Sequence, residues 1–191
     1  MSHLKRTITI NNGTKDVVPT ADASTNAINT ITYTHHEIHA GSAYYAIYSA
    51  LKDTAGLISI RIATPNTTKW AHMVFDIEAS LAATAQMWFP TTKTHEAGNA
   101  IVPMNRNHNS TNTSGLTICH TPGGTQTGTA QLTKYFGATA TGGRVAGGGG
   151  ASSRHEFILK QNSSYYILLT SRADGNAMSI TIDWYEHTAK G

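Results

Sequence analysis

The stretch Arg154–His187 decides the fold, and it reads RHEFILKQNSSYYILLTSRADGNAMSITIDWYEH. It predicts three short strands, at Glu156–Lys160, Tyr165–Ser171 and Met178–Glu186, joined by two tight turns. The second turn contains Asp174-Gly175. An Asp-Gly pair between β-rich runs is a strong hairpin signal, because glycine readily adopts the positive φ that a tight turn needs. We therefore expect these strands to form an antiparallel meander.

The side-chain pattern of this stretch indicates a sandwich. From Met178 to Trp184 apolar residues alternate with polar ones, so one face of the third strand is apolar. Tyr165–Leu169 is apolar on both faces, as expected for a central strand. Further strands are predicted upstream, at Lys5–Ile10, Thr14–Val18, Ile28–Ile38, Ala43–Leu51, Leu57–Ala63, Trp70–Glu78, Thr84–Phe89, Leu116–His120 and Thr129–Phe136. The chain is predicted to be an all-β antiparallel sandwich, jelly-roll-like, with long polar and Gly-rich loops.

Length and composition set the domain organisation. The chain has 191 residues, and we predict an N-terminal arm with a first strand at residues 1–27 and a single sandwich domain at 28–191. The Gly-rich run Gly137–Ser153 is predicted to be a mobile loop. Cys119 is the single cysteine, so no disulfide forms within the chain, and we expect this thiol to be buried.

Two classes of partner are not expected from this sequence. There is no signal-peptide pattern and no apolar run of the length that spans a membrane, so we predict no membrane binding. The basic residues are scattered and form no stripe, so we predict no nucleic-acid binding. Only 13% of the residues are charged, against roughly 25% in ordinary globular proteins, so Thr, Ser, Asn and Gly supply most of the polar surface.

Residues 35–39 read HHEIH and are the most metal-like pattern in the chain. A zinc protease needs H-E-x-x-H on a helix, whereas the spacing here is H-E-x-H within a predicted strand. On a strand, His35, Glu37 and His39 share one face and could hold a transition metal. The alternative is that they line a polar sheet face or a subunit contact, and we predict no metal or other cofactor.

Other catalytic patterns are missing. The glycine run is followed by neither the Lys nor the helix of a phosphate-binding loop, and no G-x-S-x-G nucleophile turn is present. Asp76 and Glu78 lie on one face of one predicted strand, where solvation of an outer face is the simpler role. Trp70, Trp88 and Trp184 are interpreted as core or interface anchors. We therefore predict that the chain is not an enzyme.

Three stretches carry a resemblance to a known group of proteins. They are HHEIHAGSAYY at 35–45, RIATPNTTKWAHMVF at 61–75, and EFILKQNSSYYILLTS at 156–171 together with IDWYEH at 182–187. The pattern over most of residues 28–187 resembles small virion proteins of tailed bacteriophages. This resemblance implies a jelly-roll-like sandwich, often trimeric, attached to the capsid surface or to the tail.

The first functional hypothesis is a capsid decoration (cement) or auxiliary head protein, located on the phage particle. Its partners would be the major capsid protein or other virion proteins, and further copies of itself in a trimer. The predicted capsid contacts are Lys5, Arg6, Arg106 and His108, from the N-terminal arm and the loop at 99–114. The predicted subunit interface is Tyr166, Trp184 and Tyr185. The alternatives are a tail or fibre component that binds host glycans through Tyr and Trp, and a metal-dependent jelly-roll enzyme.

Overall fold

The computed structural model describes residues 10–11, 16–17, 33–137, 147–148 and 156–188. The chain divides into two compact units, residues 1–36 and 37–191. In the first unit, β1 (Ile10–Asn11) pairs antiparallel with β2 (Asp16–Val17), and β2 lies within the predicted strand Thr14–Val18. The predicted boundary at residues 27 and 28, and all of the predicted loop at 137–153 except residues 137, 147 and 148, lie outside the described residues.

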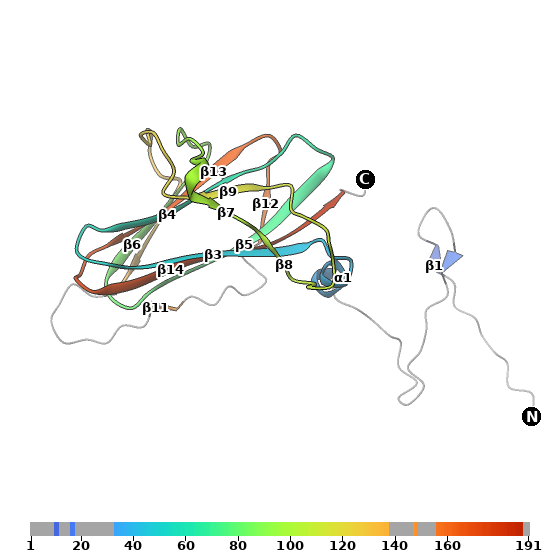
Figure 1. Cartoon of the computed structure of the whole chain (residues 1–191), viewed down its shortest axis with the longest axis horizontal. Coiled ribbons are helices and arrows are strands. Elements are labelled where there is room, and N and C mark those ends of the chain that lie inside the picture. Colours follow the sequence, from blue (N-terminus) through green and yellow to red (C-terminus); the bar gives the residue numbers. More distant parts are fainter. Residues whose placement is uncertain (1–9, 12–15, 18–32, 138–146, 149–155, 189–191) are drawn as a thin grey trace, which may run out of the picture. The chain divides into compact units, whose positions relative to one another are not determined.

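After β2 the described residues form a short helix, one 3-10 turn and twelve strands (Figure 1). These elements are α1 (Tyr33–His39), β3 (Ala43–Lys52), β4 (Leu57–Ala63), β5 (Lys69–Ala79), β6 (Ala83–Trp88), η1 (Ala97–Asn99), β7 (Ala100–Ile101), β8 (Met104–Asn105), β9 (Thr117–His120), β10 (Leu132–Phe136), β11 (Gly147–Gly148), β12 (Phe157–Leu159), β13 (Ser164–Ser171) and β14 (Asn176–Thr188).

The strands form a jelly-roll sandwich. One sheet has the order β10-β6-β13-β4-β9-β7, and the other has the order β11-β5-β14-β3-β8, with β12 also paired to β5. The first half of the chain pairs antiparallel with the second half in reverse order: β3 with β14, β4 with β13, β5 with β12, and β6 with β10. A long antiparallel ribbon rolled up in this way is the topology of a jelly roll. The predicted fold class is confirmed.

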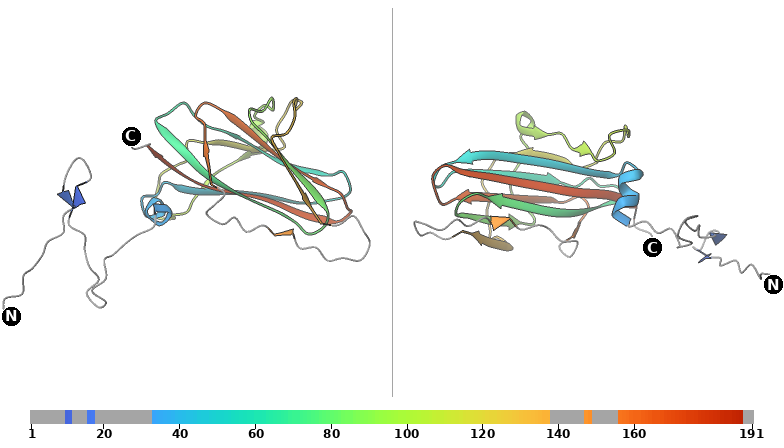
Figure 2. Two further views of the ribbon diagram at one scale, coloured as in Figure 1. Left: turned by 180° about the vertical axis from the view of Figure 1, so that it is seen from behind. Right: turned by 90° about the horizontal axis from the view of Figure 1, so that it is seen from below.

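The core lies between the two sheets, which face each other in Figure 2. The alternating residues of β4 that we expected to face inward, Ile58, Ile60 and Ile62, are at most 1% exposed. On β14, the apolar residues from Met178 to Trp184 are at most 3% exposed. The period-two patterns therefore identified the inner faces correctly. Cys119 is also buried, as expected for a small apolar side chain.

The predicted meander at the end of the chain is wrong in its pairing, although its three strands are present. β12 and β14 belong to one sheet and β13 to the other, so each connecting turn carries the chain across the sandwich. Gly175 has φ +66°, as the turn prediction required. Asp174 Oδ1, however, accepts a hydrogen bond from Thr54 N at 2.8 Å, and Gly175 N donates to Asp53 Oδ1 at 3.1 Å. This turn is therefore tied to the β3–β4 turn instead of closing a hairpin.

The predicted strand at Ile28–Ile38 is also wrong in its described part, because Tyr33–His39 is the helix α1. Gly41, with φ +71°, ends this helix. Gly41 N donates to Ile38 O and Ser42 N donates to Glu37 O, both at 3.0 Å, which is the paired closure of a Schellman motif. A Gly placed after a β-branched run marked the end of a helix here, whereas we had interpreted it as the end of a strand.

Candidate functional site

The predicted metal face at residues 35–39 does not exist in the structure. On a helix, alternate residues do not share a face, so His35, Glu37 and His39 diverge. Glu37 is buried and accepts a hydrogen bond from the Ser42 hydroxyl, whereas the two histidines are exposed. Within the described residues, no group of three or more His, Cys, Asp or Glu side chains is arranged to hold a metal ion.

The aromatic residues predicted at a subunit interface are buried within the chain. Tyr166, Trp184 and Tyr185 are 4%, 3% and 9% exposed. Tyr166 faces outward from its sheet but is covered by the Trp88 ring at 5.4 Å, and the Lys93 ammonium lies 5.5 Å from its ring centre. These rings therefore fill the fold of one chain and do not present an exposed contact surface. The trimer itself stays a prediction.

Burial of tyrosines has a consequence at alkaline pH. Burial raises the pKa of Tyr44, Tyr165 and Tyr166 above the usual value of about 10. The folded state therefore binds these phenol protons more tightly than the unfolded chain does. The free energy of unfolding is expected to fall as the pH rises above about 10.

Absorbance at 295 nm and far-ultraviolet circular dichroism, followed together from neutral pH upward, test this expectation. Three of the eight tyrosines should ionise only as the β-sheet signal disappears. Ionisation of all eight with the β-sheet signal intact would contradict it.

The predicted capsid contacts Arg106 and His108 lie on one exposed strip of the surface, whereas Lys5 and Arg6 lie outside the described residues. From Val102 to His108, exposed and half-buried residues alternate. We call the four exposed residues Val102, Met104, Arg106 and His108 the exposed strip. The first two are 77% and 50% exposed, so the strip combines apolar and basic side chains. Sequence reasoning missed both apolar members.

Asparagines on the other side of this segment hold the exposed strip in place. Asn105 Nδ2 donates to Gly41 O at 2.9 Å and to Asn112 O at 3.1 Å. Asn107 Nδ2 donates to His39 O at 3.2 Å. The Asn105 side chain also accepts from Asn107 N at 2.9 Å, which bends the chain locally. The segment that we predicted to be a polar loop is therefore a platform fixed to the C-terminal end of α1 and the residues after it.

The charge of the exposed strip is partly balanced. Arg106 Nη1 lies 3.1 Å from Asp183 Oδ1 on the outer face of β14. Burial raises the pKa of Asp183, the Arg106 guanidinium opposes this effect, and the neighbouring Asp76 carboxylate adds to it. Asp76 Oδ1 is a buried oxygen without a hydrogen-bond donor in the described part of the chain. Arg106 therefore pairs with the Asp183 carboxylate while part of its side chain stays exposed.

A second polar cluster lies on the outer side of β5 and β14. Glu156 Oε1 accepts hydrogen bonds from His72 Nδ1 at 2.6 Å and from the Tyr185 hydroxyl at 2.9 Å. His187 Nε2 lies 2.7 Å from His72 Nε2, and His187 Nδ1 lies 3.1 Å from Thr188 O. His72 therefore links the Glu156 carboxylate to the His187 ring. The cluster thus joins the start of β12 to β5 and β14.

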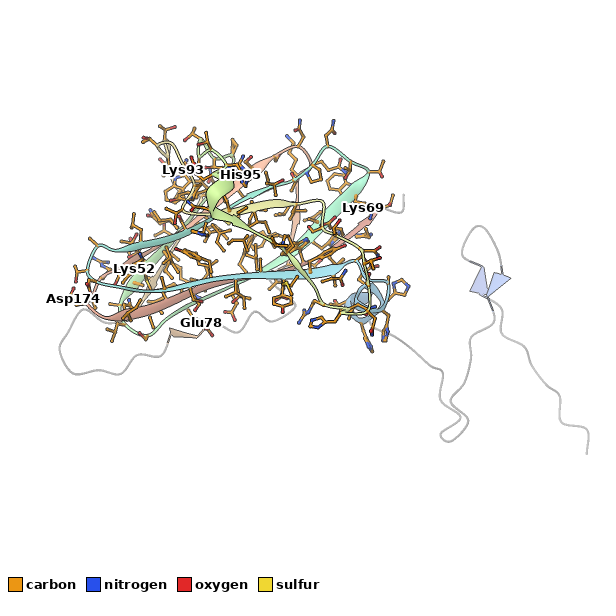
Figure 3. The ribbon with its side chains drawn as sticks, viewed as in Figure 1. Lys52, Lys69, Glu78, Lys93, His95 and Asp174 are labelled. Carbon is orange, nitrogen blue, oxygen red and sulfur yellow. The ribbon has the colours of Figure 1, made fainter. Side chains whose placement is uncertain are left out.

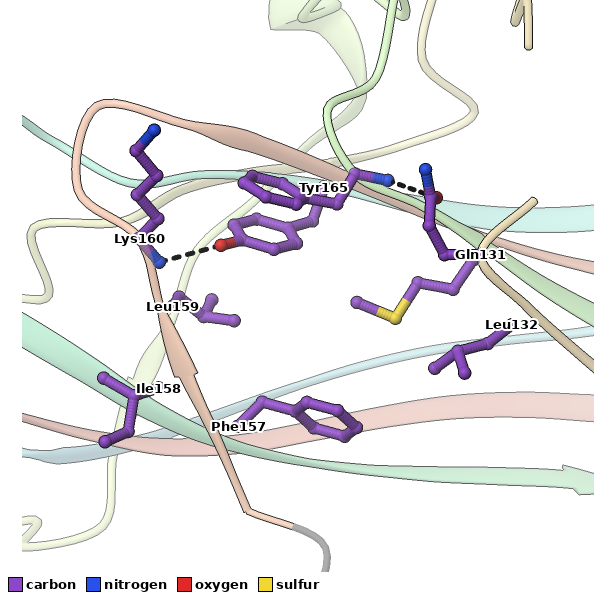
Figure 4. A pocket seen from close by; sticks show the side chains of 9 residues that line it. Gln131, Leu132, Phe157, Ile158, Leu159, Lys160 and Tyr165 are labelled. Carbon is purple, nitrogen blue, oxygen red and sulfur yellow. Dashed lines mark hydrogen bonds between the residues drawn. The ribbon is translucent and has the colours of Figure 1, made fainter. Parts of the chain in front are cut away.

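A pocket of about 380 Å³ opens between β12 and the edge formed by β6 and β10 (Figure 4). Two polar groups of its lining are already bonded. Gln131 Oε1 accepts from Phe89 N at 2.8 Å, and the Tyr165 hydroxyl accepts from Lys160 N at 2.8 Å. The pocket therefore offers mainly apolar surface. Its lining is Met87, Phe89, Gln131, Leu132, Phe157, Ile158, Leu159, Lys160 and Tyr165.

The fold defines the class of this protein, which is an all-β jelly-roll sandwich. Comparisons with protein-family models, with curated proteins and with solved structures find no match for this chain. Among the described residues, no helix has the length and apolar character needed to cross a membrane.

Proposed function

We propose that this chain is a structural virion protein, a decoration protein that binds the capsid of a tailed bacteriophage. The exposed strip carries the proposal. It presents two apolar side chains, Val102 and Met104, beside the basic Arg106, on a segment that is already ordered by asparagines. Preorganised contacts of this kind bind at a lower entropic cost than a flexible loop does.

The chemistry of the described residues favours binding over catalysis. The His72–His187–Glu156 cluster has its hydrogen bonds satisfied internally, and the apolar pocket lies elsewhere, at the edge beside β12. A catalytic site needs a nucleophile or an acid–base group beside a space for substrate. Neither the histidine cluster nor the pocket combines such a group with a space for substrate.

Binding of host glycans by a tail or fibre protein receives less support from the surface. Glycan binding was expected through Tyr and Trp, but Trp88, Trp184, Tyr165 and Tyr166 are buried. Large aromatic rings exposed in the described residues are those of Tyr135 and Phe157. Tyr135 is 69% exposed, but the Arg172 guanidinium lies 6.0 Å from its ring centre.

The mechanism of a decoration protein would be multivalent binding. Many copies placed on a regular shell each add a modest contact between neighbouring capsid subunits. Modest single contacts are sufficient because the copies act together. Added interface area then opposes the expansion of the shell under the pressure of the packaged DNA.

Cryo-electron microscopy of virus particles that carry this chain tests the proposal directly. The expected result is density for the jelly roll on the outside of the head, with the exposed strip turned toward the capsid subunits. Density on the tail would favour the fibre alternative. Absence of the chain from purified particles would overturn the proposal.

Charge placed on the exposed strip is expected to weaken binding to the particle. Met104→Asp puts a carboxylate into the apolar part of the strip and should weaken binding by about tenfold or more, because burying an unpaired charge at an interface costs over 1 kcal/mol. The matched control is Leu132→Asp, since Leu132 is 51% exposed on β10 against 50% for Met104.

Quantitative co-sedimentation of each purified variant with undecorated particles measures the effect. Circular dichroism confirms that both variants fold. Equal affinities for the two variants would show that the exposed strip is not the contact.

A further inference from the structure

β3 has the longest open edge among the described strands. It pairs with β14 along its whole length, but on its other side β8 covers only Tyr44 and Tyr45. In the described part of the chain, residues 46–52 have no strand partner on that side, and Figure 2 shows β3 as the outer long strand of its sheet. An open edge of this length is a template for another strand.

The backbone groups that point to this open edge can be identified. Ala43 O accepts a hydrogen bond from Arg106 N at 2.8 Å, so the backbone of Ala43 faces the β8 side. Backbone direction alternates along a strand, and the β3–β14 register runs without a bulge. The N–H and C=O groups of Ile47, Ser49 and Leu51 therefore point away from β14, toward the open edge.

This edge lacks the features that usually prevent pairing with other chains. Natural edges are blunted by Pro, by bulges, by short strands or by charged residues, Lys above all. Residues 46–51 contain no Pro and no charge, and the first charge is Lys52 at the end of the strand, near the turn that contains Asp174 (Figure 3). The edge strand β10 of the other sheet, by contrast, is five residues long and carries Lys134 at its centre.

We propose that a second copy of this chain pairs antiparallel with the open edge of β3, with a two-fold axis at Ser49. In this register Ile47 of each copy lies opposite Leu51 of the other, and these side chains are 51% and 70% exposed in the single chain. All three outward-pointing positions form hydrogen-bonded pairs, which gives about six backbone hydrogen bonds. Two apolar cross-strand pairs flank the axis, and no like charges oppose each other.

The absence of charge on residues 46–51 selects a second copy as the occupant. The edge is neutral, so it matches itself and offers no specific attraction to a charged peptide. Pairing over six residues buries much less than the roughly 1,600 Å² of a standard stable interface, so the dimer forms reversibly and depends on concentration. This inference does not depend on capsid binding, because the exposed strip and the segment at 46–51 are different residues.

Disulfide trapping in the full chain tests the two-fold axis. In Ser49→Cys, the two introduced thiols would lie on α-carbons about 5.5 Å apart, within the range that a disulfide bridges. Ser179→Cys is the matched control, since Ser179 Oγ is 2.8 Å from Ser49 Oγ on the same face, one strand further from the edge. The introduced thiols of that control would be about 14 Å apart, or three strand spacings.

Each variant is incubated with oxidised glutathione and run on a non-reducing gel; the native Cys119 is buried and present in both. The expected result is a disulfide-linked dimer for Ser49→Cys and monomer for Ser179→Cys. Adding Ile47→Lys to Ser49→Cys should reduce the dimer at least fivefold, while circular dichroism confirms folding.

Three outcomes would overturn the inference. They are monomer for Ser49→Cys, equal dimer from both single variants, and dimer that is insensitive to Ile47→Lys. Monomer with the introduced thiol protected from alkylation would show that another segment or partner covers the edge.

Discussion

Replacement of Asn176 by Asp is expected to lower the free energy of unfolding by about 3 kcal/mol at neutral pH. Asn176 is fully buried at the start of β14. Its Oδ1 accepts from Leu81 N at 2.8 Å and from the Ser80 hydroxyl at 3.2 Å, and its Nδ2 donates to Ala82 O at 2.9 Å and to Ser171 Oγ at 3.2 Å. A carboxylate cannot donate, so Ala82 O would face a buried negative charge of almost the same shape.

Urea unfolding at pH 7 and at about pH 4 measures the effect of this substitution. The loss in the free energy of unfolding, relative to the unsubstituted chain, should be smaller at the lower pH, because a protonated carboxyl group regains one donor. The control is Asn66→Asp, which makes the same chemical change at an exposed turn residue and should cost less than about 0.5 kcal/mol. If the two variants lose equal stability, the hydrogen bonds of Asn176 do not determine the cost.

The inner faces of the long strands could be predicted from the sequence because the period of two is a local signal. Ile58, Ile60 and Ile62 alternate with polar neighbours, and any sheet that includes them must bury one set. The same reasoning succeeded for Met178 to Trp184. Burial of the alternate face does not depend on which strand lies beside it, so this part of the prediction needed no knowledge of topology.

Strand pairing could not be predicted in the same way, because it depends on contacts between distant residues. Asp174 and Gly175 have the sequence of a hairpin turn, yet their partners are Thr54 and Asp53 of another turn. Asn176 then fixes the chain to residues 80–82, between β5 and β6. A turn residue sets the local backbone direction, whereas these long-range bonds decide which sheet the next strand joins.

Only part of the candidate site could be predicted from the sequence. Arg106 and His108 were predicted as contacts, but the segment was interpreted as a flexible polar loop. The available signal was the alternation of Asn with other residues from Met104 to Asn109, since asparagine side chains bond to nearby backbone groups in turns. Their partners, His39 O and Gly41 O, lie at the end of α1 and just after it, and the wrong prediction of a strand there prevented us from predicting these contacts.

Removal of the Glu186 carboxylate is expected to destabilise both the fold and the segment that carries the exposed strip. Glu186 is 5% exposed, and its Oε1 accepts from Trp184 Nε1 at 3.0 Å, from the Ser114 hydroxyl at 2.5 Å and from Gly115 N at 3.1 Å. Glu186→Ala leaves these three donors without their acceptor in a buried place. We expect a loss of about 3–4 kcal/mol in the free energy of unfolding.

Glu186→Gln removes the negative charge but keeps a hydrogen-bond acceptor. The amide keeps one oxygen in the same place, so most hydrogen bonds to Oε1 can persist and the expected loss is about 1–2 kcal/mol. Ser114 and Gly115 end the segment that begins at the exposed strip. Their hydrogen bonds to Glu186 therefore connect this carboxylate to the segment that carries the strip. Hydrogen–deuterium exchange should therefore rise over residues 105–115 in Glu186→Ala, and much less in Glu186→Gln.

Urea unfolding and hydrogen–deuterium exchange, measured on the same samples, distinguish two effects of Glu186→Ala. The substitution either releases residues 105–115 by removing the hydrogen bonds of Glu186, or it only leaves a cavity beside Trp184. A cavity would destabilise the fold through the Trp184 contact, and exchange at residues 105–115 would stay as in the unsubstituted chain. If the free energy of unfolding of Glu186→Ala lies within about 1 kcal/mol of that of the unsubstituted chain, the hydrogen bonds of the carboxylate do not stabilise the fold as expected. If Glu186→Gln is more stable than the unsubstituted chain, the charge itself destabilises the fold, because a buried carboxylate without a cation then costs more than its hydrogen bonds contribute.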